Sequence, residues 1–324
     1  MEKKYPLLFA LAIVSLFVSC GPTEEIGLGY SVNVPTQPEV PTFTAPTAQQ
    51  FSAVQATALE NRTQHFTIGT NDPWTSFTSE KGVIVWLSGN CFTLNGVPVT
   101  GDVNIDYVEL FDRGNMLVTN KTTMGVLPNG DKSLLLSGGE VYINVTQNGQ
   151  QLDTNCGLSV SIPTSLTGGT VPGMLPWKGT VDAAGNVVWE QQFIDFWVGT
   201  EQGQSEESFN AYLEDFGWFN CDKFYNFEGP KTDVEIIVPQ GYNNINSQVF
   251  VALVNTPNTL GNLSGEYPIG LQCHLIFVTG DGADGWIYAI KSVTLPEDAS
   301  YTFTPEEFIT ATETEVVAAI NALP

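Results

Sequence analysis

Histidine and cysteine side chains can act in catalysis and can bind metal ions. This chain of 324 residues has only two histidines, His65 and His274. They lie in regions predicted below to be separate domains, so most metal sites and catalytic triads are excluded. Cys273 directly precedes His274, which is the pair that a cysteine nucleophile requires. Adjacent residues of a strand point to opposite faces, and an extracytoplasmic cysteine is more often oxidised. The sequence therefore favours a structural role for this pair.

Carboxylates are the second possible source of chemistry. The segment from Ser205 to Asp222 contains Glu206, Glu207, Glu214, Asp215 and Asp222. Glycoside hydrolysis needs two carboxyl groups about 5–10 Å apart. Because the chain has 35 acidic residues, some pair always satisfies this requirement. A secreted carbohydrate-directed hydrolase that uses carboxylates of this segment is therefore kept as the alternative hypothesis.

Asp281 and Asp284 lie in a glycine-rich run at residues 280–285. Loops that bind calcium supply oxygen ligands at alternate positions, so a calcium site is one hypothesis for this run. The spacing lacks the closing glutamate of an EF-hand, and a hairpin turn before Trp286 is the favoured interpretation. We expect no metal and no cofactor.

Aromatic residues crowd the segment 189–224. The candidates for a binding surface are Trp189, Trp197 and Trp218, with phenylalanines between them. Exposed rings bind sugars or another protein, whereas buried rings form core. The sequence leaves both interpretations open.

The chain carries 11 basic and 35 acidic residues, a formal charge of −24. Nucleic-acid binding needs a cationic surface, so a nucleic-acid partner is excluded. A hydrophobic content of 42% is normal for a globular protein.

Residues 1–19 have the pattern of a signal peptide, with Lys3 and Lys4 before an apolar run too short to span a bilayer. The run ends at Ser19-Cys20, which resembles a bacterial lipobox. The resemblance implies that Cys20 carries lipid and anchors the protein to the outer membrane, at its periplasmic face or the cell surface; an ordinary secretory signal is the alternative. Residues 20–60 are rich in proline and threonine and are predicted to form a tether.

The other cysteines are Cys91, Cys156, Cys221 and Cys273. In an extracytoplasmic compartment they are candidates for two disulfides. We favour Cys91 with Cys156 and Cys221 with Cys273, because each bridge then stays inside one predicted domain.

Strand patterns dominate the rest of the chain. The continuous apolar run at 83–87 indicates a strand buried on both faces, while Val103, Ile105 and Tyr107 alternate with polar residues. Turn pairs such as Asn148-Gly149 separate such segments. The pattern predicts an all-β fold of two β-sandwich domains in tandem, at 61–163 and 164–324.

Two helical segments are predicted. Residues 205–214 begin with a capping serine and place Phe209, Tyr212 and Leu213 at helical spacing, just before Phe216. Near the end of the chain, Thr304 to Glu307 forms a capping box, which predicts a short C-terminal helical segment.

Several of these motifs carry a resemblance to a family. Asn90-Cys91-Phe92, the run Gly96 to Gly101, and Gly138 to Ile143 followed by Asn148-Gly149 resemble the N-terminal module of uncharacterised Bacteroidota surface lipoproteins. That module is similar to the ZU5-type β-sandwich, an interaction module. The run from Gly217 to Asp222 resembles a second segment of the same lipoproteins. The resemblance implies a fold and a location and carries over no catalytic residue.

We therefore expect a cell-envelope lipoprotein that acts as a non-enzymatic binding or structural module. Its expected partners are the membrane, through the N-terminal lipid, and another envelope protein or a glycan.

Overall fold

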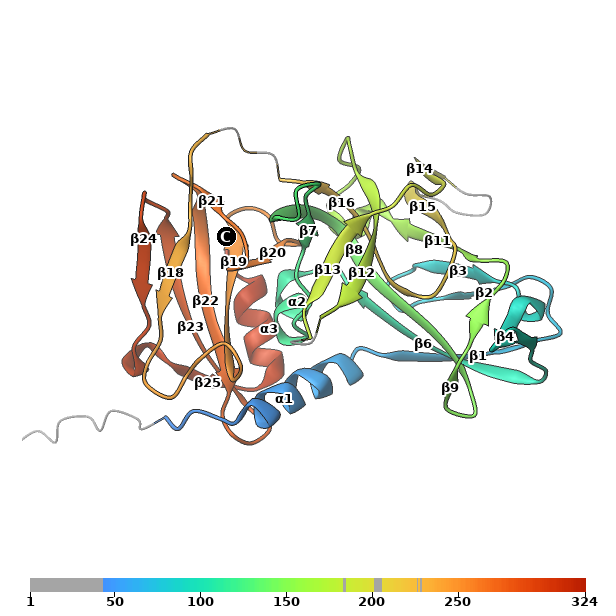
Figure 1. Ribbon diagram of the computed structural model, residues 1–324, viewed down its shortest axis with the longest axis horizontal. Coiled ribbons are helices and arrows are strands. Elements are labelled where there is room, and N and C mark those ends of the chain that lie inside the picture. The colour runs from blue at the N-terminus through green and yellow to red at the C-terminus, as the bar shows by residue number, and fades with distance from the viewer. Residues whose placement is uncertain (1–42, 183–184, 201–205, 226, 228) are drawn as a thin grey trace, which may run out of the picture. The chain divides into compact units, whose positions relative to one another are not determined.

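The computed structural model describes residues 43–182, 185–200, 206–225, 227 and 229–324 (Figure 1). The structure is 48% strand and 14% helix, which confirms the all-β prediction. The predicted signal peptide, Cys20 and the first part of the tether lie outside the described residues.

The longest strand, β8, organises the largest sheet. The eight strands are β1 (Gln64–Gly69), β6 (Asp102–Leu110), β7 (Met124–Val126), β8 (Lys132–Gln147), β9 (Gln150–Gln151), β12 (Leu175–Val181), β13 (Val187–Gln191) and β16 (Gly217–Phe224). Residues 132–134 of β8 pair with β7 and residues 140–146 pair with β6, while β16 pairs with residues 135–143 on the other side. Because β7 also pairs with β13, five of these strands form a closed ring of pairings, in the order β8, β16, β12, β13 and β7.

Gly138 and Gly139 lie inside β8. A Cβ atom at Gly138 would lie 2.4 Å from the carbonyl oxygen of Cys221, and β16 has a bulge at this point, between Asn220 and Asp222. Gly138 therefore lets two backbones approach within one sheet, while Gly139 has a positive φ angle and leaves room for the Phe111 ring.

A second sheet of five strands covers one face of the first. Its order is β14 (Phe196–Gly199), β15 (Ser208–Leu213), β11 (Leu158–Pro163), β3 (Ile84–Leu87) and β2 (Thr75–Thr78). Val85, Val160 and Phe209 from this sheet pack with Ile105 and Ile143 from the first, as in a β-sandwich. A small sheet of β10 (Asp153–Thr154), β4 (Phe92–Leu94) and β5 (Val97–Pro98) closes one end.

The predicted helix at 205–214 is wrong, because Ser208–Leu213 is strand β15. Phe209, Ala211 and Leu213 alternate into the sandwich core, so the period is two and not 3.6. The same aromatic and aliphatic residues satisfy both spacings, and the pairing with β11 decides between them.

The C-terminal part of the chain forms a third sheet. Its strands are β20 (Leu260–Asn262), β19 (Ser247–Leu253), β22 (Gln272–Gly280), β23 (Trp286–Thr294) and β25 (Ile309–Ala311). Two strand pairs accompany it, β17 (Lys231–Thr232) with β21 (Tyr267–Pro268) and β18 (Val234–Ile237) with β24 (Ala299–Thr302). Phe277, Phe303 and Phe308 belong to a separate core that these elements share.

Three α-helices share a core with the first and third sheets (Figure 1). They are α1 (Ala48–Glu60), α2 (Arg113–Val118) and α3 (Glu313–Asn321), with 3-10 turns at η1 (Gly89–Cys91), η2 (Thr164–Thr167) and η3 (Pro305–Glu307). The predicted C-terminal helical segment is confirmed, although Thr304 caps only η3 and α3 starts after Thr312. None of the helices in the described ranges has the length and apolar character needed to cross a membrane.

The predicted C-terminal boundary of the tether, residue 60, is wrong, because residues 48–60 form helix α1 of the folded part. Thr47 and Gln50 form a capping box that opens α1, and the helix buries Phe51, Val54 and Ala58. The Phe51 ring meets the Trp286 ring edge-on, with centroids 6.3 Å apart. The spacing of the three buried residues is that of one helix face, and it places α1 in the folded part.

The tandem arrangement of two separate sandwiches is not confirmed. Strands on either side of the predicted division between residues 163 and 164 pair directly, β11 with β15 and β8 with β16. Residues Val40–Pro324 form one compact unit.

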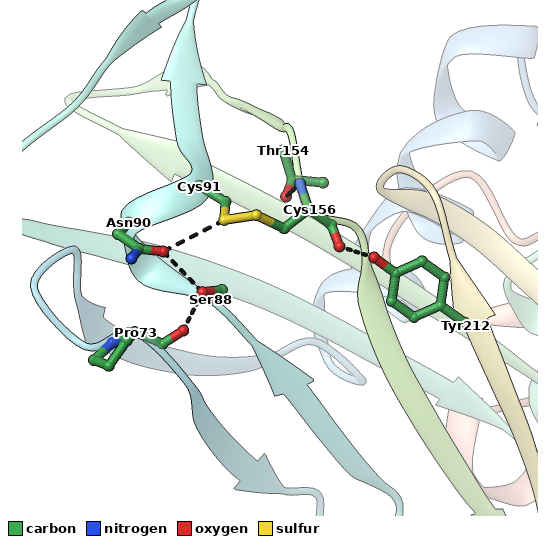
Figure 2. Close-up of a disulfide and its surroundings, with 7 residues drawn as sticks. All are labelled: Pro73, Ser88, Asn90, Cys91, Thr154, Cys156 and Tyr212. Atoms are coloured by element: carbon green, nitrogen blue, oxygen red, sulfur yellow. Dashed lines mark hydrogen bonds between the residues drawn. A yellow bond between two sulfur atoms is a disulfide. The ribbon is translucent and has the colours of Figure 1, made fainter.

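One of the two predicted disulfides is present. Cys91 and Cys156 are bonded with a Cα–Cα distance of 5.7 Å, and the bridge ties η1 to the segment before β11 (Figure 2). The predicted bridge between Cys221 and Cys273 is wrong, since both are free and buried. Cys221 lies in the sandwich core and Cys273 in the core of the third sheet, so they belong to different cores.

Replacing both Cys91 and Cys156 with alanine should lower the free energy of unfolding by about 4 kcal/mol, because the bridge closes a loop with a sequence separation of 65. Urea unfolding with and without reductant measures this. Reductant should destabilise the wild-type chain and leave the double variant unchanged. Equal destabilisation of both would show that another bridge carries the effect.

Candidate functional site

Two of the three candidate aromatic residues are core. Trp189 is fully buried and its Nε1 donates to the Thr122 carbonyl oxygen at 2.8 Å. Trp218 is also buried, and its ring packs against Tyr142 with centroids 5.1 Å apart. The prediction of a binding role for these two tryptophans is therefore wrong, because they fill the space between the first sheet and the helices.

Trp197 lies on an open face. It belongs to β14, the edge strand of the five-stranded sheet, which pairs with β15 and with no other strand of the described residues. The ring of Phe196 stacks on Phe209 inside the sandwich, so the next residue, Trp197, points to the outer face. Its side chain is 45% exposed, and Phe193 in the segment entering β14 is 94% exposed.

Two more aromatic residues share this outer face. The register places Tyr212 of β15 opposite Ser159 of β11, and Ser159 opposite Trp86 of β3. Directly paired residues point to the same face, so Trp86, Ser159 and Tyr212 form one row across three strands. Trp86 is half-buried and Tyr212 is 37% exposed. We name Trp86, Trp197 and Tyr212 the aromatic surface.

The disulfide fixes one member of the aromatic surface. The Tyr212 hydroxyl donates to the carbonyl oxygen of Cys156 (Figure 2). Cys156 is bonded to Cys91, whose neighbour Asn90 accepts a hydrogen bond from Ser88 at 2.8 Å. The Tyr212 ring is thereby held at both ends, by β15 and by the bridged segment. A ring that is already fixed loses little entropy when a ligand covers it.

Polar groups separate the rings. Ser159 lies between Trp86 and Tyr212, and Asn210 lies opposite Trp197. The Asn210 amide donates to the backbone oxygens of Gly199 and Ser208 at 3.2 and 3.0 Å. Asn210 is buried, so the polar group that lies between the rings on this face is the Ser159 hydroxyl. Flat rings with a hydroxyl group between them match the apolar faces and hydroxyl groups of a sugar chain.

The carboxylates of the segment 205–222 do not gather at one site. Glu206 and Glu207 are exposed before β15, and Glu207 accepts a hydrogen bond from Thr170 at 2.6 Å. Asp215 forms an ion pair with Lys178. Asp222 is completely buried. Ser205 lies outside the described residues.

A pocket of about 440 Å³, counting its open mouth, lies at the turn between β15 and β16. Glu214, Asp215, Lys178 and Gln192 contribute polar groups, and Phe216 contributes an aromatic side chain. The Lys178 ammonium group already neutralises Asp215, so the pocket offers one carboxylate without an ion-pair partner among its lining residues.

The remaining predicted residues are structural. Burial raises the pKa of Cys273 to about 12, so its thiol is protonated at neutral pH. His274 is buried and its Nδ1 is 2.8 Å from the Ser292 hydroxyl oxygen. Asp281 accepts hydrogen bonds from the backbone of Ala283 and Gly285 in the hairpin between β22 and β23, so the turn interpretation is confirmed.

No group of three or more metal-ligating side chains occurs among the described residues, and Asp284 belongs to the same hairpin turn. Comparisons of the chain with protein-family models, curated proteins and solved structures found no match.

Three residues were not predicted from the sequence. Trp86 was assigned to a strand buried on both faces, and Tyr212 to a helix. Their pairing through Ser159 is a long-range contact that no local pattern encodes. The third is Glu140, a completely buried carboxyl group, whose signal is an acidic residue within the apolar strand β8.

Replacing Trp197 with alanine should change the free energy of unfolding by less than about 0.5 kcal/mol, because the ring is largely outside the core. Replacing Trp189 with alanine should cost about 3–5 kcal/mol through the cavity it leaves. Urea unfolding of the two variants provides a matched pair. Equal costs would place Trp197 in the core and contradict the surface.

Proposed function

We propose that the protein is a lipid-anchored module of the bacterial cell envelope, and that it binds neutral glycan chains through the aromatic surface. Binding without bond cleavage is the function that this arrangement of side chains supports best. The observation that carries the proposal is the row of rings and hydroxyl groups on an open sheet face, beside the exposed Trp197.

Composition supports a neutral ligand. Removal of the predicted signal at residues 1–19 leaves 9 basic and 34 acidic residues, a formal charge of −25. Such a charge repels acidic polysaccharides and nucleic acids. Within the aromatic surface and its intervening polar residues there is no charged side chain, so a neutral chain meets no desolvation cost from an ion.

The disulfide supports an extracytoplasmic location. Bridges of this kind persist in oxidising compartments and are rare in the cytosol. The lipobox resemblance at Ser19-Cys20 and the resemblance to Bacteroidota surface lipoproteins point the same way. The lipid on Cys20 would hold the binding module at the outer membrane.

Metabolic labelling with radioactive palmitate tests the anchor. The wild-type chain should incorporate label and fractionate with the outer membrane, whereas the Cys20→Ser variant should do neither, because its processed N-terminus has no thiol to acylate. Equal labelling of both chains would show that the lipid is attached at another residue. No labelling of the wild-type chain would contradict the proposed anchor.

Affinity electrophoresis in gels that contain neutral polysaccharides tests the binding. Using the lipid-free Cys20→Ser chain as parent, we expect retardation by at least one of them, and Trp197→Ala should weaken binding about tenfold or more. Trp74→Ala is the matched control, because Trp74 is 53% exposed and lies outside the aromatic surface. Tyr212→Phe keeps the ring and should keep most of the binding.

Three outcomes would contradict this proposal. Equal loss of polysaccharide binding in the Trp74 and Trp197 variants would show that the effect of Trp197→Ala is nonspecific. No retardation by any polysaccharide would contradict a glycan ligand. Release of reducing sugar that is lost on replacing Glu207 with glutamine would instead support the hydrolase hypothesis.

A further inference from the structure

Glu140 is a buried carboxyl group without a hydrogen-bond partner among the described residues. It lies in β8, opposite Leu110 of β6 and Asn220 of β16, and is completely buried. Neither of its side-chain oxygens has a hydrogen-bond partner in the described part of the chain. An ionised carboxylate in this position would lack compensation for its lost hydration.

Glu109 shows how the same sheet accommodates a buried carboxyl group that has hydrogen-bond donors. Glu109 is also buried, yet it accepts hydrogen bonds from Ser79 at 2.6 Å, from Gln64 at 3.0 Å and from the backbone of Lys81 at 3.0 Å. Glu109 and Glu140 therefore differ in their partners and not in their depth. The contrast provides a matched control within one fold.

The second carboxyl group of the site is Asp222 on the neighbouring strand β16. It accepts hydrogen bonds from the Gly138 backbone at 3.1 Å and from the Asn220 amide at 2.6 Å. Burial and the charge of Asp222 raise the pKa of Glu140 well above its usual range. Burial also raises the pKa of Asp222, but its two N–H donors favour the ionised form, so the proton belongs to Glu140.

The nearest cation does not neutralise Glu140 directly. The Lys121 ammonium group donates to the Thr119 and Gly185 backbone oxygens, both at 3.0 Å, and does not hydrogen-bond to either side-chain oxygen of Glu140. Its attraction to Glu140 is shared with Asp182 in the turn after β12. Burial lowers the pKa of Lys121 and further limits its help.

This site adjoins the contact with the third sheet. Ser137 lies directly opposite Asp222 and its backbone N–H donates to the Thr259 hydroxyl at 3.3 Å. Asn258 donates to the Ser137 carbonyl oxygen. Residues 258 and 259 belong to the loop between β19 and β20, so a disturbance at Asp222 acts next to two of the bonds that hold this loop.

We propose that Glu140 and Asp222 form a buried site that binds one proton, and that loss of this proton weakens docking of the β19–β20 loop onto the central sheet. With the proton bound, the site holds one negative charge with two hydrogen-bond donors. Without it, two like charges share a volume that water does not reach. The protein thereby couples the contact between its sheets to pH.

The linkage has a definite sign. A group whose pKa is higher in the folded than in the unfolded chain keeps its proton on folding, so unfolding releases it. The stabilisation is complete below the unfolded value of about 4.3 and is lost as pH rises towards the folded pKa. Through that window, the unfolding equilibrium constant of the wild-type chain should rise about tenfold per pH unit relative to Glu140→Gln.

Urea unfolding of the full chain with Cys20→Ser, at a series of pH values, measures this slope. The Glu140→Gln variant should lose this dependence of the unfolding free energy on pH, whatever the variant's absolute stability. The Glu109→Gln variant should keep the dependence. Identical slopes for the wild type and Glu140→Gln would overturn the proposal. Addition of calcium chloride should leave the slope unchanged. If calcium instead stabilises the wild-type chain but not Glu140→Gln, the site binds a metal ion instead of a proton and the proposal is overturned.

A second measurement does not depend on any variant folding. Infrared spectra of the folded wild-type chain in heavy water at neutral pH should contain the C=O stretching band of a neutral carboxylic acid. The band should disappear as pH is raised, together with faster hydrogen exchange at residues 258–260 after correction for the intrinsic rate. Absence of the band at neutral pH, or no change in exchange as it disappears, would contradict the proposal.

Discussion

The central sheet is covered on both faces, and most of the structure follows from that constraint. One face of β8 packs into the sandwich core through Val141 and Ile143, and the other meets the helices and the third sheet through Leu135 and Tyr142. The covered faces of this sheet cannot contact a ligand. The far face of the outer sheet carries the aromatic surface, and we therefore place the proposed contact with a partner there.

The same constraint explains the polar residues inside. Every polar side chain on β8 and β16 must find a partner within the protein, and the Asn220 and Asp222 side chains do so with each other. Arg113 is buried as well and donates to the backbone oxygens of Ile320 and Leu253, both at 3.0 Å, which joins α2 to α3 and the third sheet. Both side-chain oxygens of Glu140 lack such a partner among the described residues, and in our proposal a bound proton removes the charge of this group.

Local patterns predicted much of the fold. The turn at Asn148-Gly149 has the positive φ angles of a two-residue hairpin, and the strands at Ser247–Leu253 and Trp286–Thr294 follow their apolar runs closely. The helix prediction at 205–214 failed because Phe209 and Leu213 fit both a helix face and a strand face. The division of the chain into two sandwiches could not be judged locally, because β8 pairs with strands on both sides of the predicted boundary.

The candidate site was only partly predictable. Trp197 is exposed, but nothing in the sequence separates it from the buried Trp189, because exposure depends on which strand lies at the sheet edge. Trp86 and Tyr212 join it only through Ser159, a residue without aromatic or charged character. An aromatic count thus predicts that rings are present, and strand register decides which of them a ligand can reach.

Hydroxyl-radical footprinting with mass spectrometry is the most direct test of that central claim. In the free protein, Trp197 and Phe193 should be oxidised readily, and Trp189 and Trp218 should not. A bound neutral polysaccharide should protect Trp197 and Tyr212 and leave Trp74 unchanged. Oxidation of Trp189 at the rate of Trp197, or equal protection of Trp74, would contradict the assignment of the outer sheet as the binding face.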